Sequence, residues 1–109
     1  MKALGVFQVF RCNKIGAGYI LDGRLLADIC ITDKLFIIKN KDIKKSYCYK
    51  NKREQIEVCD NAHLSDIDLK GIFSYGKQWD ALQGGMTARI ECFCDGMIEG
   101  NDMICKFNS

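Results

Sequence analysis

The sequence predicts an all-β domain, and three observations lead to this conclusion. Several stretches alternate apolar and polar residues with a period of two, as half-buried strands do. Glycines separate these stretches at the spacing expected of turns between short strands. No stretch has both the apolar spacing and the length of an amphipathic helix. Many short strands joined by glycine turns are typical of a β-barrel or a β-sandwich.

The first expected strand covers residues 4–11. Neighbouring apolar pairs at residues 6–7 and 9–10 shift the alternation within it and indicate a β-bulge. A turn is expected at residues 16–18, where two glycines precede the β-prone residues 19–21. The N-terminal part of the chain is therefore expected to form a bulged strand followed by a second strand.

The two clearest strands are expected at residues 67–75 and 86–95. Alternate residues from Met86 to Cys94 are apolar, which predicts one face directed into the core. The same alternation at residues 67–75 predicts one apolar face that carries Ile67, Leu69, Gly71, Phe73 and Tyr75. Shorter β-rich stretches lie at residues 35–39 and 55–59. The strands therefore extend through the whole sequence.

Helix is expected only as single turns, at residues 60–66 and 77–82. The chain of 109 residues contains no proline, no low-complexity tract and no repeat. No shift in composition marks a linker between domains. The sequence therefore predicts a single domain that covers residues 1–109.

The cysteine content and the apolar runs indicate where the protein resides. Seven cysteines would suggest disulfides in a secreted chain, but no signal peptide is recognisable. We therefore expect a cytoplasmic protein whose thiols are reduced. The longest aliphatic and aromatic run, residues 35–38, is far shorter than the roughly 20 residues of a membrane-spanning helix. No membrane partner is expected.

Two parts of the sequence resemble a known family. Residues 16–25 (GAGYILDGRL) and 29–37 (ICITDKLFI) are similar to the opening of domain 2 of elongation factor Tu and related translational GTPases. Residues 85–91 (GMTARIE) and 96–104 (GMIEGNDMI) resemble the last strands of that domain. Residues 40–66 depart from the family pattern and are longer than its norm.

The resemblance implies a small closed antiparallel barrel of six strands. It also implies a binding role, since in translation factors this domain packs on the GTPase domain and in some members contacts transfer or ribosomal RNA. The G-x-x-x-x-G-K-[ST] phosphate-binding motif is absent from this sequence. We therefore expect a stand-alone, non-catalytic binding module without a cofactor.

A basic segment at residues 39–53 is the strongest functional candidate. It contains seven basic residues and one acidic residue, a local charge of +6 in a chain of net charge +2. Lysines and arginines neutralise phosphates, and interspersed tyrosines stack on bases. The candidate nucleic-acid-binding residues are Lys44, Lys45, Tyr47, Tyr49, Lys50, Lys52 and Arg53. The alternative is a solvated hairpin whose lysines protect the edge of a sheet.

Other site types have weaker support in the sequence. Cys92 and Cys94 share a strand face, and with Cys59 and His63 they provide metal-ligand types. That face is apolar and no C-x2-C pair is present, so we favour buried thiols and predict no metal. No orienting group accompanies Cys59 and His63, so we predict no catalytic site. The partner is expected to be RNA, a ribonucleoprotein or another protein with an anionic surface, and the alternative function is a protein-interaction or regulatory barrel without nucleic acid.

Overall fold

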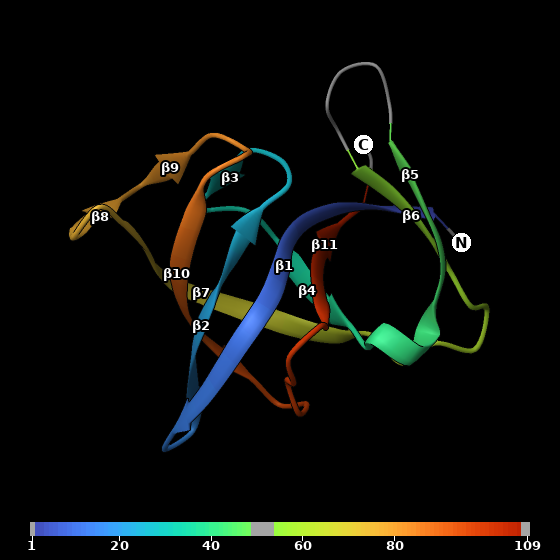
Figure 1. Cartoon of the computed structure of the whole chain (residues 1–109). Coiled ribbons are helices and arrows are strands. Elements are labelled where there is room, and N and C mark those ends of the chain that lie inside the picture. The colour runs from blue at the N-terminus through green and yellow to red at the C-terminus, as the bar shows by residue number, and fades with distance from the viewer. Residues whose placement is uncertain (1, 49–53, 108–109) are drawn as a thin grey trace.

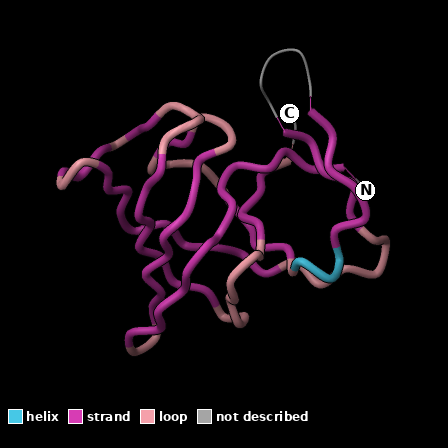
Figure 2. Tube along the Cα trace, in the orientation of Figure 1, coloured by secondary structure: helices cyan, strands magenta, loops and turns pink. Residues whose placement is uncertain are grey.

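The structure is a computed structural model that describes residues 2–48 and 54–107, with side chains for all of these except residues 45–48 and 54. Strands dominate the described chain, and one 3-10 turn is the sole helical element there (Figure 2). The elements in order are β1 (Lys2–Ile15), β2 (Gly18–Leu25), β3 (Ile29–Cys30), β4 (Leu35–Ile38), η1 (Asn40–Asp42), β5 (Ile43–Cys48), β6 (Glu54–Val58), β7 (Ser65–Ser74), β8 (Lys77–Trp79), β9 (Ala81–Leu82), β10 (Thr87–Cys94) and β11 (Met103–Lys106).

Six of these strands form a closed barrel. They pair in the order β1-β2-β10-β7-β4-β11, and β11 pairs back onto β1. Every pairing in this ring is antiparallel. Closure removes the sheet edges that six strands would otherwise expose. The all-β prediction and the expected six-stranded antiparallel barrel are confirmed.

The barrel interior is filled by the inward-facing residues of its strands. On β2, Tyr19, Leu21 and Leu25 are buried, and on β10, Ala88, Ile90 and Cys92 are buried. The intervening residues are exposed, as Arg24 and Arg89 are, or half-buried, as Asp22 and Glu91 are. This is the period of two that the sequence shows. The apolar interior is the principal source of stability.

A second apolar core lies outside the barrel. The hairpin of β5 and β6 folds over the outer surface of β4 and β11, and β6 pairs with the first residues of β1 (Figure 1). Buried residues from both layers form this core: Ala3, Phe36, Ile38, Ile56, Val58, Met103 and Cys105. All four residues of β4 are therefore buried, which explains its unbroken apolar sequence. The segment of residues 40–58 is therefore an addition to the six-stranded barrel.

A buried carboxylate connects the base of this hairpin to the barrel. Asp102 is 3% exposed and precedes β11. It accepts hydrogen bonds from Lys39 Nζ at 2.7 Å and from the backbone N–H groups of Asn40 and Glu99 at 3.0 and 2.8 Å. Burial alone would lower the pKa of Lys39, but the hydrogen bond and the charge of Asp102 raise it overall. The ammonium group thus stays charged, and the pair fixes the start of η1.

Two local expectations are wrong. Residues 77–82 form the short strands β8 and β9 because β8 pairs with β7, and β9 pairs with β3. Residues 60–66 contain a turn at 60–61 and the first two residues of β7, and no helix. No helix in the described ranges is both long enough and apolar enough to cross a bilayer.

The expected alternation in β7 is also wrong beyond Leu69. Leu69 and Gly71 pair with consecutive residues of β10, so Lys70 is an extra residue that forms a bulge. The bulge moves every later side chain of β7 to the opposite face. Ile72 is therefore buried, while Phe73 is half-buried and Tyr75 is exposed. The bulge expected in β1 is confirmed, since Phe10 is the extra residue between Val9 and Arg11 in the pairing with β2.

Candidate nucleic-acid interface

Three of the seven predicted residues of the basic hairpin lie on an edge strand. Lys44 lies on β5 and is exposed. Lys45 and Tyr47 also belong to β5, which pairs only with β6 among the described strands. The other candidates, Tyr49, Lys50, Lys52 and Arg53, lie outside the described residues.

Lys39, the first basic residue of the segment, has a structural role. Its Nζ atom lies 2.7 Å from the Oδ2 atom of Asp102 and 3.6 Å from the Oε1 atom of Glu99. Two carboxylates thus balance its charge. Residues 40–53 contain six basic residues and Asp42, which leaves a charge of +5. The excess positive charge therefore belongs to η1, β5 and the residues that follow.

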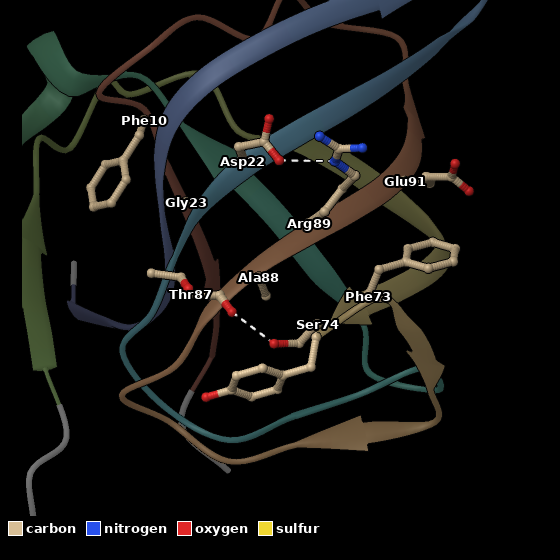
Figure 3. Close-up of a pocket in the computed structure, with 11 residues that line it drawn as sticks. Phe10, Asp22, Gly23, Phe73, Ser74, Thr87, Ala88, Arg89 and Glu91 are labelled. Carbon is tan, nitrogen blue, oxygen red and sulfur yellow. Dashed lines mark hydrogen bonds and ion pairs between the residues drawn. The ribbon is translucent and has the colours of Figure 1, made fainter.

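A second candidate surface is an open groove on another side of the barrel, with a volume of about 680 Å³. It crosses the outer face of β1, β2, β10 and β7, the four strands of the ring other than the covered strands β4 and β11. Figure 3 shows Phe10 and Phe73 on opposite sides of it. Its lining residues are Phe10, Asp22, Gly23, Phe73, Ser74, Tyr75, Gly76, Thr87, Ala88, Arg89 and Glu91.

Three aromatic residues line this groove, and irregular backbone places each of them there. Phe10 is the bulged residue of β1 and is 59% exposed. Phe73 faces outward because of the bulge at Lys70. Tyr75 is 82% exposed and lies in the two-residue turn between β7 and β8. Without these irregularities, the alternation would direct Phe73 and Tyr75 toward the other face.

The turn that holds Tyr75 is conformationally unusual. Tyr75 and Gly76 both have positive φ angles, of 53° and 71°, as a type I′ hairpin turn requires. Asn or Gly is the usual residue at the first of these positions, because a bulky side chain is unfavourable there. Trp79 Nε1 donates a hydrogen bond to the Ser74 carbonyl at 2.9 Å, and Ser74 Oγ donates one to the Thr87 carbonyl at 3.0 Å. These bonds fix the turn against β10.

Charged side chains lie among the aromatic residues. Arg89 Nε donates a hydrogen bond to Asp22 Oδ1 at 2.9 Å (Figure 3). The hydrogen bond and the charge of Asp22 raise the pKa of Arg89, so the guanidinium stays charged. In the strand register, Arg11 of β1 lies opposite Asp22 of β2, and Arg24 of β2 lies opposite Thr87 of β10. Both are exposed and lie beside the groove. The lining itself contains one arginine, Arg89, and two carboxylates, Asp22 and Glu91.

The six cysteines whose side chains the structure describes form no metal site. Cys92 lies in the barrel core, where burial and then the charge of Cys94 raise its pKa to about 12. The thiol is therefore protonated at neutral pH. His63 is exposed in the loop after β6. In the part of the chain that the structure describes, no three His, Cys, Asp or Glu side chains are placed to hold a metal ion.

Comparison of the chain with protein-family models, with curated proteins and with solved structures gives no match.

Sequence reasoning did not find the groove. Its aromatic residues are far apart in the sequence, and the alternation assigns Phe73 and Tyr75 to the core. One signal was available, since Tyr75-Gly76 is followed by polar residues at the end of a strand and has the form of a hairpin turn. A large aromatic residue in that turn is exposed whatever the register.

Proposed function

We propose that the protein is a non-catalytic module that binds RNA through the basic hairpin. The observation that carries this proposal is the position of the basic segment on an anchored hairpin. Ile56 and Val58 of β6 hold the hairpin against the barrel, and Lys44 on the neighbouring strand is exposed. A charge of +5 over residues 40–53 is an electrostatic footprint suited to a phosphate backbone.

The resemblance to domain 2 of the translation factors supports the same proposal. In that family the barrel acts without a nucleotide site of its own, and some members contact RNA. Membership of the family, a stand-alone role in translation and a cytoplasmic location are parts of this proposal. The closed antiparallel barrel is compatible with them.

Charge reversal on β5 tests the hairpin. The variant combines Lys44→Glu with Lys45→Glu, and binding of a fluorescein-labelled RNA is followed by fluorescence anisotropy at low salt. We expect a loss of affinity of at least about tenfold and a shallower dependence on salt, because phosphate contacts release counterions. Lys14→Glu with Lys34→Glu is the control, since it changes the net charge equally outside the hairpin. Equal affinity of the wild type and the β5 variant for RNA would contradict the proposal.

A second candidate function is protein binding by strand addition. The outer edge of β5 has no partner strand among the described residues, and such an edge can pair with an extended peptide. If that function is correct, binding of a protein partner is insensitive to salt and to nuclease. RNA that elutes alone from the immobilised protein would argue against it.

A further inference from the structure

We propose that the groove on the outer face of β1, β2, β10 and β7 binds unpaired bases, so that the protein selects single-stranded over double-stranded RNA. This inference rests on the proposal that the protein binds RNA, but it does not depend on the hairpin. It names the part of the RNA that is recognised. It also assigns a role to Phe10, Phe73 and Tyr75, which the hairpin does not use.

The first argument is the placement of the aromatic rings. The barrel has a filled interior of its own, so these rings are not needed for its core. Two bulges and one turn with positive φ direct three rings to a single groove. Tyr75 departs from local preference, because a turn of this type accommodates Asn far better than Tyr. Departures from local rules are concentrated at functional positions.

The second argument is the size of the groove. Phe10 and Phe73 lie on strands separated by three strand spacings, or about 14 Å measured along the curved sheet. With a volume of about 680 Å³, the groove can accommodate more than one base. It is also open to solvent along the outer face of the sheet, as a continuous strand of RNA requires. Aromatic side chains on a barrel surface stack on successive bases without regard to sequence.

The third argument is charge. Arg11, Arg24 and Arg89 lie on the same outer face, and Arg11 and Arg24 have exposed side chains. The Arg89 ion pair with Asp22 is partly exposed, so its contribution is small and it can exchange for a phosphate contact. The lining itself contains one guanidinium group, Arg89, and two carboxylates, Asp22 and Glu91. Arg11 and Arg24, which lie beside the groove, supply the further cationic groups that phosphates require while the bases stack on the rings.

The variant Tyr75→Asn is the central test. It removes the ring and creates an Asn-Gly turn, which is the preferred sequence for this geometry. The fold is therefore expected to keep or to increase its melting temperature, while the affinity for single-stranded RNA falls by at least about fivefold. The affinity for a duplex of the same sequence is expected to be much weaker than for the single strand, and unchanged by the substitution. Phe107→Ser is the control, because Phe107 is 56% exposed and lies outside the groove.

The variant Asp22→Asn distinguishes RNA from a cationic peptide. It removes a negative charge and releases Arg89, so RNA binding is expected to strengthen about two- to threefold. A groove for Lys- or Arg-rich peptides would instead bind its ligand more weakly after this change. Weaker RNA binding by Asp22→Asn overturns the inference. So does equal affinity for single and double strands, or wild-type affinity in Tyr75→Asn.

These outcomes separate the groove from the hairpin. Loss of RNA binding in the β5 double variant, with no effect of Tyr75→Asn, supports the hairpin as the RNA-binding site and contradicts the groove proposal. Loss of RNA binding in Tyr75→Asn, with no effect of the β5 double variant, supports the groove and contradicts the hairpin proposal. If the wild-type protein binds neither form of RNA at low salt, both proposals fail.

Discussion

The barrel has two outer faces, and they differ in whether a second layer of the chain covers them. The face formed by β4 and β11 is apolar and is covered by the β5–β6 hairpin, with Phe36, Ile38 and Cys105 buried beneath it. The face formed by β1, β2, β10 and β7 has no such cover and carries exposed aromatic and charged side chains. On the covered face the apolar residues follow regular alternation. On the open face, backbone irregularities place the aromatic residues.

Under the groove proposal, this difference separates the apolar residues that stabilise the fold from the aromatic residues that bind RNA. Apolar residues that stabilise the protein are those that the hairpin or the barrel interior encloses. Phe10 and Tyr75 are exposed in spite of their size, and two separate distortions bring them to the same groove. We infer that the covered face contributes stability and that the open face contributes binding.

The largest effect is expected from opening the covered face. Ile56→Ala removes a fully buried side chain from the second core and is expected to lower the free energy of unfolding by about 2–4 kcal/mol. Phe10→Ser on the open face should change it by less than about 0.5 kcal/mol. Urea denaturation followed by tryptophan fluorescence measures both. Similar losses for the two variants would show that the open face is also part of the core.

A smaller effect is expected at the base of the hairpin. Asp102→Asn leaves the ammonium group of Lys39 with only the more distant carboxylate of Glu99. This should cost about 2 kcal/mol of stability, because the Asp102 carboxylate is buried. Asp68→Asn is the matched control, since Asp68 forms an exposed pair with Lys70 at 2.9 Å. That control should change stability by less than about 0.5 kcal/mol. Thermal denaturation of the two variants tests the contrast, and equal melting temperatures would disprove it.

The smallest effect is a difference in thiol reactivity. The Thr32 hydroxyl and backbone N–H groups lower the pKa of Cys30, so its thiolate forms at a lower pH than that of an ordinary cysteine. The raised pKa of Cys92 has the opposite consequence. Native alkylation followed by mass spectrometry should therefore modify Cys30 first, Cys105 beneath the hairpin more slowly, and Cys92 last. Modification of Cys105 together with Cys92 would mean that the hairpin opens only when the barrel unfolds.

The barrel strands were predictable because alternation is strong where one face meets the core and the other meets solvent. The strand at Thr87–Cys94 is the clearest example. The double burial of β4 was not predictable, since an unbroken apolar run does not show what covers its second face. The prediction of which β7 side chains face the core is wrong after Lys70. The unpaired Lys70 moves every later side chain of that strand to the opposite face. The groove was missed for the same reason.

The closing pair of the barrel has a consequence for how the chain folds. Leu4 pairs with Lys106 and Gln8 with Met103, so the ring joins segments that are separated by nearly the whole described sequence. Contacts this distant form slowly, because a long loop must be ordered before they contribute. During synthesis β1 is made before β11. Until β11 emerges, the apolar residues of β1 can pack only against earlier strands such as β2 and β6. The barrel is therefore expected to close only after the ribosome has released the strand that completes it.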